Sequence, residues 1–560
     1  MAIKRRKRGN RVYLEEWKST RRNGKVVSTF VRYIGPEGGK RRAAPIDRMM
    51  HGDAVHSGAV RLLWSLAEDL HFSETIDRIS GANHADEGPT PGKLLTVWAI
   101  NRVLDPMSAT KLERWIPATE LPALAGMDAC EFSKDAFLHA LDSVCRYDAG
   151  AGTEIGSIRA IDDALYREWR NAHPLNGRAT LAYDLTDILF SGMTCPIAAK
   201  GANPDHQNRL QVNVTVVADR HDGAPLFHFV YDGRRNGSTT LRNLLVELQK
   251  SGTEKGLLVV DRGIVNRANV EQCTGIGWHL LGGVSTHLKD ARAAIAATDV
   301  PETPDTLVAE SRTGPVYAVK TTGKLFGGER ELIVYSNAQR GMREREARNS
   351  ALKRTGMALD ALSIDGREWR EARLHREMKK ITAGWDGLID ASVKRNGRQR
   401  IVWHYRKREI ARETDMDGKY LLICTDGTMD ARSVVGTYFS KDFVEKAFRT
   451  LKSSIEIEPV RHRLTHRVRG YVFVCMLAYR LETALRRLLV EGGADVNTAE
   501  YMERLLSELS EVRRVEVTLG GQSKTWYLNV TDFIREGLKK LDRKELLNED
   551  VGGNSLRQTG

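Results

Sequence analysis

The sequence predicts an α/β fold, in which a central mixed sheet is flanked by helices. A β-rich run begins in ATLAYDLTDILFSG, and LQVNVTVVADRHDGAPLFHFVYDG continues it with two more strands around His221-Asp222-Gly223. The helical pattern TTLRNLLVELQKSG follows, and GLLVVDRG then has the pattern of a buried strand that ends in an aspartate and a glycine turn. A meander, a helix and a buried strand in this order indicate a mixed sheet.

Two segments precede this sheet. VYLEEWKSTRRNGKVVSTFVRYIG predicts two strands around the dipeptide Asn-Gly, which is the strongest short signal of a hairpin. After it the apolar periods become helical, and Pro91 suits the first position of a helix. We therefore expect a basic N-terminal arm and hairpin over residues 1–50 and an all-α domain over residues 51–175.

The sheet itself is predicted in two parts. Its first part covers residues 176–290, and short strands alternating with a highly charged helical stretch over residues 291–425 predict a β-rich insertion. The second part, residues 426–490, contains the amphipathic helix YFSKDFVEKAFRTLKS and then a buried helix. Residues 491–560 predict a hairpin from RRVEVTLGG and KTWYLNV, followed by a polar tail with possible assembly contacts.

Composition and motifs exclude several classes of protein. With 41% hydrophobic and 28% charged residues and no apolar run of about 18, the chain predicts a soluble protein without a membrane span. No apolar segment follows the basic N-terminus, which argues against a secretory signal. The six cysteines form no CxxC pair, which suits a reducing cytosol rather than a disulfide scaffold or a cysteine zinc site. GKLFGGER, residues 323–330, lacks P-loop spacing, so no nucleotide cofactor is expected.

Most of the net charge of +13 is concentrated in an N-terminal arm, because residues 1–42 hold 14 Lys or Arg against 3 Glu. Each cation placed on a phosphate releases condensed counterions, so the arm fits a polyanion. A solubilising tail or contact with an anionic membrane are the alternatives, and the lack of an amphipathic Leu/Trp face favours nucleic acid. The predicted DNA contacts of the arm are Lys4, Arg5, Arg6, Lys7 and Arg8.

Two aspartates are candidates for chemistry in the sheet. Asp261 ends the buried run GLLVV, where α/β sheets commonly bind ligands, although a lone aspartate there is often a turn or cap residue. Asp184 interrupts an apolar strand, and a buried carboxylate must be paired, protonated or metal-bound. Asp187 falls on the opposite face of that strand by its period of two, so we treat it as a decoy.

A third acid, Glu445, lies in YFSKDFVEKAFRTLKS. On one continuous helix, Tyr438, Lys441, Glu445 and Lys452 fall within a stripe of about 60°, opposite the apolar face. Taken alone, Glu445 is a surface glutamate that pairs with a cation three or four residues away. Together with two aspartates it has the donor chemistry that two divalent cations need for phosphoryl transfer.

The spacing Y-x2-K-x3-E-x6-K over residues 438–452 resembles the YREK signature of the DDE transposases of bacterial insertion sequences, in the insertion-sequence-four superfamily. YDLTDILF is similar to that family's first-aspartate strand and GLLVVDRG to its second. IEPVRHRLTHRVRGYVFVCMLAYRL resembles the segment after the glutamate helix, while the YIG hairpin and NRVLDPMSATKLERW are similar to a long-chain subgroup. The resemblance touches nearly the whole chain and is specific around residues 181–192, 256–264 and 438–481.

The resemblance implies an RNase H-like catalytic core and a transposase that cleaves DNA at the ends of an element and transfers the strands into target DNA. Asp184, Asp261 and Glu445 would be the catalytic residues and the ligands of two Mg²⁺ (or Mn²⁺) ions. Lys441 stands where the family has arginine, so the charge is kept and the bidentate fork is lost. The implied DNA contacts are Tyr438, Lys441, Arg449, Lys452, His462 and Arg467.

The implied partners are terminal inverted repeats and target DNA, with a homodimer or higher oligomer in the complex and a location in the bacterial cytoplasm, associated with the nucleoid. The all-α region is the candidate for binding DNA ends. Two other functions stay open: a non-catalytic DNA-binding regulator derived from a transposase, and an RNase H-like nuclease without strand transfer.

Two smaller signals have competing interpretations. His462 and His466 have a spacing that could ligate a metal, but their arginine-rich surroundings favour phosphate contact. Trp385 and Trp403 could stack on an unpaired base, although packing in a core is the simpler interpretation.

Overall fold

The structure is a computed structural model of the 560-residue chain. It describes residues 2–8, 11–22, 25–36, 49–51, 54–81, 89–150, 153–175, 177–192, 194–203, 205–251, 253–396, 398–440, 442–494, 498–519 and 522–548. The chain divides into two compact units, of which the larger is formed by Val55–Val512 and Asn529–Leu547. The smaller consists of Met1–Ala54, Arg513–Leu528 and Asn548–Gly560.

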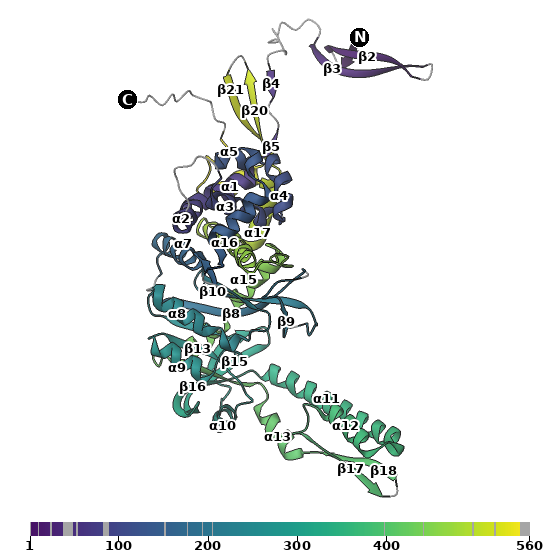
Figure 1. Cartoon of the computed structure of the whole chain (residues 1–560), viewed down its shortest axis with the longest axis vertical. Coiled ribbons are helices and arrows are strands. Elements are labelled where there is room, and N and C mark those ends of the chain that lie inside the picture. The colour runs from purple at the N-terminus through teal and green to yellow at the C-terminus, as the bar shows by residue number, and fades with distance from the viewer. Residues whose placement is uncertain are drawn as a thin grey trace. The chain divides into compact units, whose positions relative to one another are not determined.

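A mixed sheet is the centre of the larger unit (Figure 1). In the described residues its strand order is β11-β10-β8-β12-β13-β19-β16-β15-β14, with the short strand β9 on β10. β10 pairs antiparallel with β8 and β11, whereas β12 lies parallel to both β8 and β13. The predicted α/β class with a mixed sheet is confirmed. The bounds are β8 Thr180–Leu189, β9 Ala199–Lys200, β10 Leu210–Asp219, β11 Pro225–Asp232, β12 Leu257–Val260, β13 His279–Val284, β14 Leu307–Ser311, β15 Gly314–Leu325, β16 Gly328–Ser336 and β19 Lys419–Cys424.

Burial explains why these residues form strands. β10 is buried from Gln211 to Asp219 and β12 along its whole length, and both are rich in the β-branched and leucine side chains that pack well between covering layers. Helices that contact the sheet supply part of this cover: α9 contacts β13, α10 contacts β15 and β19, and α15 contacts β8 and β10. The bounds of the helices around the sheet are α8 Leu241–Ser251, α9 Arg267–Gly275, α10 Lys289–Ala297, α14 Ala431–Phe439 and α15 Asp442–Ser453.

The region predicted to be all-α contains seven helices within its described residues and also a small hairpin. β6 (Cys145–Asp148) and β7 (Thr153–Gly156) pair antiparallel, so the region expected to be all-α is not helical over these residues. Side-chain spacing was continuous there, but Cys145 turns the chain into an extended conformation directly after the helix. The helices are α1 Gly58–Asp69, α2 Phe72–Ser80, α3 Pro91–Leu104, α4 Ala109–Trp115, α5 Leu121–Ala125, α6 Lys134–Val144 and α7 Ile158–Ala172.

The helix α16 (Thr465–Glu491) joins this region to the sheet. It contacts α3, α6 and β11, and nearly every residue from Val468 to Leu485 is buried, which confirms the predicted buried helix. A helix that is apolar around most of its circumference must be enclosed by other elements. Further helices, α17 (Thr498–Ser510) and α18 (Asp532–Lys540), contact α16 from the C-terminal side of the chain.

One buried acid on α16 makes stability depend on pH. Glu482 is 4% exposed, and burial, opposed by Arg486 and reinforced by Glu503, raises its pKa from 4.5 to about 7. Because the folded state holds this proton more tightly, the stabilisation it brings is complete below pH 4.5 and is lost as the pH rises through 7. The shift corresponds to about 3 kcal/mol.

We expect Glu482→Gln to remove this dependence and to make the protein more stable than the wild type at pH 8. Urea denaturation of both proteins at pH 5 and pH 8 measures the difference. Glu491→Gln, at the exposed end of the same helix, is the matched control and should leave the wild-type profile unchanged. Equal pH profiles for the wild type and Glu482→Gln would contradict the prediction.

The segment predicted as one β-rich insertion has two different parts. Four of its strands, β14, β15, β16 and β19, extend the main sheet and are therefore not separate from it. The remainder carries helices α11 (Ala338–Asp365), α12 (Glu371–Thr382) and α13 (Lys407–Met416) and the hairpin of β17 (Ile389–Asn396) and β18 (Arg398–Tyr405). Part of the segment predicted as an insertion thus belongs to the main sheet, because strand pairing between distant residues is not visible in local periodicity.

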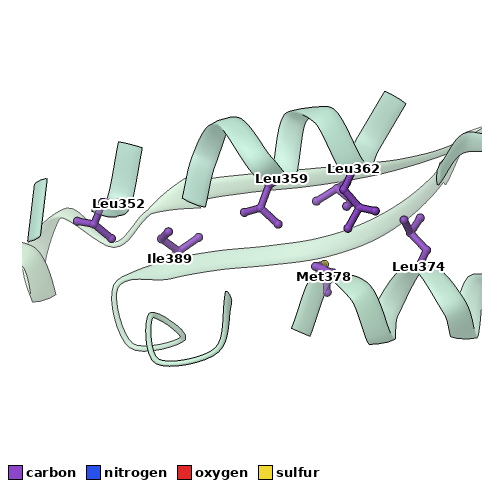
Figure 2. Packing of buried hydrophobic residues seen from close by; sticks show 7 residues of the cluster. Leu352, Leu359, Leu362, Leu374, Met378 and Ile389 are labelled. Atoms are coloured by element: carbon purple, nitrogen blue, oxygen red, sulfur yellow. The ribbon is translucent and has the colours of Figure 1, made fainter. Parts of the chain in front are cut away.

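The helical part of that segment has a core of its own. In Figure 2, Leu359 of α11 lies near Ile389 at the start of the hairpin, and Leu362 of α11 lies near Leu374 of α12. Trp385 and Trp403 pack against this cluster, and the Trp403 indole donates a hydrogen bond to Asp360 at 2.8 Å. Core packing is thus confirmed for both tryptophans. The cluster consists of Leu352, Leu359, Leu362, Leu374, Met378, Ile389 and Ile401.

The smaller unit contains two short sheets. In the first, β1 (Ala2–Arg8) pairs with β2 (Arg11–Arg22), which pairs with β3 (Lys25–Pro36). The predicted hairpin is confirmed, with its Asn23-Gly24 turn outside the described residues, but the basic segment expected to be an arm is a third strand. In the second, β20 (Arg513–Leu519) pairs with β21 (Gln522–Leu528), as predicted, and with β4 (Met49–His51).

Candidate functional site

The two aspartates lie at matching positions on neighbouring parallel strands. Tyr183 of β8 is in register with Val260 of β12; Asp184 follows Tyr183 on β8, and Asp261 is the residue directly after the end of β12. Adjacent strands lie about 4.8 Å apart, so the register brings the two backbone positions side by side. Both aspartates are partly exposed, and the backbone NH of Leu185 donates to the Asp184 carboxylate at 2.8 Å. The sequence alone did not reveal this register.

Asp187 differs from the other two in its surroundings. It is 6% exposed, and its carboxylate accepts a hydrogen bond from Arg209 at 2.8 Å. It lies one step out of the alternation that Asp184 follows along β8. Its charge is therefore balanced within the fold, which agrees with its interpretation as a decoy.

The helix predicted to carry all four stripe residues is two helices. Tyr438 lies near the end of α14, whose C-cap is Ser440, and α15 begins at Asp442. The prediction of one continuous helix is therefore wrong, and Lys441 lies outside the described residues. No proline or glycine marks the break. The calculated stripe of about 60° does not apply to Tyr438, because it belongs to a different helix axis.

Tyr438 is 8% exposed and lies against the sheet. A Cβ atom at Gly283 of β13 would come within 2.7 Å of the Tyr438 hydroxyl oxygen, so that strand position accepts only a glycine while the tyrosine is in place. The tyrosine therefore docks the end of α14 on β13. The prediction that it contacts DNA stays a prediction, and its present position is that of a packing residue.

Glu445 is exposed on α15, the helix that contacts β8 and β10. Lys452 lies further along the same helix, and its ammonium is 3.9 Å from the Glu458 carboxylate. Glu458 also accepts a hydrogen bond from the backbone NH of Leu189, at 2.8 Å, and so ties the chain after α15 to the end of β8. The sequence analysis missed Glu458, because a glutamate in an irregular segment carries no periodic signal.

Carboxylate oxygens are the ligands that hard divalent cations prefer, so the chemistry of the three acids suits such a metal. Among the residues that the structure describes, however, no group of three or more His, Cys, Asp or Glu side chains is arranged to hold a metal ion. The two aspartates share adjacent strand positions, whereas Glu445 is on a helix alongside β8. The structure thus brings two of the three candidate ligands together.

The basic segment after α15 is packed against the helical region. His462 lies between Trp98 and Tyr471, with ring centroids 6.4 and 5.3 Å away, and burial together with the charge of Arg467 lowers its pKa to about 4. Arg467 donates two hydrogen bonds to Asp142 of α6, at 2.8 and 2.6 Å. His462 is therefore neutral at pH 7, and the guanidinium of Arg467 is already engaged.

The other predicted DNA contacts lie on separate surfaces. Arg449 is exposed on α15 and lines a hollow shared with Glu482 and Glu503. In the smaller unit Lys4, Arg5 and Arg6 are exposed, with the Lys4 ammonium 4.6 Å from the ring centre of Trp17. The side chains of Lys7 and Arg8 lie outside the described residues.

In the described part of the chain, no helix is long and apolar enough to cross a bilayer. No family model and no curated protein matches the sequence. Among solved structures, the chain is similar to a piggyBac transposase in a synaptic complex with hairpin DNA, at 12% identity and a TM-score of 0.39. That match covers 90% of this chain and 88% of the other.

Proposed function

We propose that this chain is a DDE transposase of a bacterial insertion sequence, with an RNase H-like core. The observation that carries the proposal is the register of β8 and β12, which sets Asp184 and Asp261 side by side at the strand positions that the resemblance assigns to the first two acids. The contact of α15 with β8 adds support, because this helix carries the third acid. The proposed site would thus be formed by α15, β8 and the end of β12, which are far apart in sequence.

In this proposal Asp184 and Asp261 form the fixed half of the site and Glu445 approaches them when DNA and metal bind. Two Mg²⁺ (or Mn²⁺) ions, when bound, would supply the charge that activates a water or a DNA 3′-hydroxyl and stabilises the leaving oxygen. Lys441 and Lys452 would hold phosphates beside the acids. Lys452 is restrained by Glu458, so its ammonium is directed toward the end of β8.

The proposed substrates are the terminal inverted repeats of the element and target DNA, bound by a homodimer or higher oligomer in the cytoplasm, near the nucleoid. No nucleotide cofactor is needed, because phosphodiester bonds are exchanged rather than made anew. The basic strand β1 fits the same partner, since its exposed cations would displace counterions from a phosphate backbone.

The test uses the purified full-length protein and a DNA fragment carrying the sequences that flank its own coding region. With Mg²⁺ we expect strand breaks at fixed positions and, with a plasmid present, joined products; with EDTA we expect neither. Breaks without joined products would indicate the nuclease, and tight binding without breaks would indicate the non-catalytic regulator. Breaks that persist in EDTA would contradict a metal-dependent site.

A further inference from the structure

A groove of about 730 Å³ lies between the helical region and the segment that follows α15. Its lining comes from α3, the start of α4, the start of α6 and residues 456–471. These pieces are distant in sequence, so no local pattern reveals the groove. Its most numerous charged groups are cations, and Glu456 and Glu458 are the acidic residues among those that line it.

Buried and paired groups hold the walls of this groove in place. Arg102, 4% exposed, donates hydrogen bonds to the backbone carbonyls of Ile455 and Glu456, which anchors the segment after α15 on α3. On the other side Asp142 of α6 accepts from Arg467, and its carboxylate lies 3.2 Å from His466. Arg102 and Arg467 therefore hold the walls of the groove together, and their guanidinium groups already bond to groups of the protein.

Four other cations at the groove are differently placed. Lys111 of α4, Lys134 at the start of α6, and Arg461 and Arg463 are all exposed, and none forms an ion pair with a residue that the structure describes. Exposed cations that lie around a concave surface and form no ion pairs raise the local concentration of anions there. Such charges, contributed by three separate elements around one groove, fit an extended polyanion better than a small anion.

The groove is connected to the candidate site. Glu458 lines the groove and also receives the Lys452 ammonium and the Leu189 backbone NH at the end of β8. Val460 continues this contact, because its backbone pairs with the chain around Phe190. A strand of nucleic acid that passes Lys452 would therefore reach the groove over the same short segment.

We propose that this groove binds the phosphate backbone of duplex DNA beyond the candidate site, through Lys111, Lys134, Arg461 and Arg463. The proposal rests on the proposed function for the identity of the polyanion. It differs from the sequence-based prediction in assigning the contacts to these four cations, and it makes His462 and Arg467 residues that position the groove.

The test replaces all four residues with glutamine and measures binding of a duplex DNA by fluorescence anisotropy at several salt concentrations. We expect affinity to fall at least about tenfold near 0.15 M salt, and the slope of log K against log salt to shrink by about 4, or roughly one per phosphate contact. The matched control replaces Arg343, Lys353, Arg354 and Lys379, which are exposed cations of α11 and α12, and should change the slope little.

Equal losses of DNA affinity in the two variants would contradict the proposed role of the groove, since total charge alone would then explain binding. Tighter binding of a duplex RNA than of the DNA, lost in the groove variant, would also overturn it. The proposed function is tested separately. If the wild type binds DNA through the groove but breaks no strand with Mg²⁺, the proposed DNA-binding role of the groove is supported and the proposed transposase activity is contradicted. If the wild type breaks strands but the groove variant binds DNA as tightly as the wild type does, strand cleavage is supported and the DNA-binding role of the groove is contradicted.

Discussion

Replacing Glu445 with glutamine is expected to reduce DNA strand cleavage by roughly 10³-fold or more, because a neutral amide cannot replace an anionic ligand at a metal-dependent centre. Glu445 is exposed, so the change removes no buried contact and the fold should be kept. Binding of DNA in the absence of metal should stay within about twofold, since an exposed glutamate adds no attraction to phosphate. Cleavage of the flanking DNA and its binding are measured on the same preparations.

Asp187→Asn is the control for this experiment. The residue lies on β8, three positions after Asp184, and its carboxylate belongs to the ion pair with Arg209. Its loss costs stability but should leave cleavage near the wild-type rate. Asp261→Asn should behave like Glu445→Gln. If Glu445→Gln cleaves as fast as Asp187→Asn, then Glu445 is an ordinary surface residue and the assignment of the third acid fails.

The second large effect concerns stability and involves a buried charge cluster between α7, β11 and α16. Asp162 is fully buried, accepts a hydrogen bond from Arg480 at 3.1 Å and lies 2.8 Å from His228 and 3.7 Å from Arg159. Burial alone would raise the pKa of Asp162, but His228, Arg480 and Arg159 outweigh it and lower the pKa. Asp162 is thus the counter-charge of the buried Arg480 and of the half-buried Arg159.

We expect Asp162→Ala to lower the free energy of unfolding by about 3–5 kcal/mol, because it leaves the Arg480 guanidinium buried without an anion. Urea denaturation followed by fluorescence measures the loss. The control, Asp163→Ala, removes the neighbouring acid of the same helix, which pairs with Arg167, itself 60% exposed. An ion pair of this kind contributes at most about 1 kcal/mol. Equal losses in both variants would contradict the role given to the buried cluster.

The strands and the long helix could be predicted from the sequence because their signals are local. The apolar run that became β12, the β-rich run that became β8, and the apolar residues around most of the circumference of α16 each require burial of a particular kind, whatever surrounds them. The candidate acids were found in the same way, since a carboxylate in an apolar strand is costly wherever that strand lies.

The break between α14 and α15 had no such signal. Residues near 440 are compatible with a helix, and the break accompanies the docking of Tyr438 on Gly283, a contact between residues far apart in sequence. The same holds for β19, which joins the main sheet between β13 and β16, although its sequence neighbours belong to a separate helical cluster.

By itself, the sequence determined the class of fold, the identity of most elements and the types of residue available for chemistry, because periodicity and composition act over a few residues. Only the tertiary structure decided which of these residues meet. The register of β8 with β12 placed Asp184 beside Asp261, and Asp142 engaged Arg467, which the sequence left available for DNA. Such pairings depend on chain segments tens to hundreds of residues apart, whose approach is set by the packing of the whole unit rather than by any local preference.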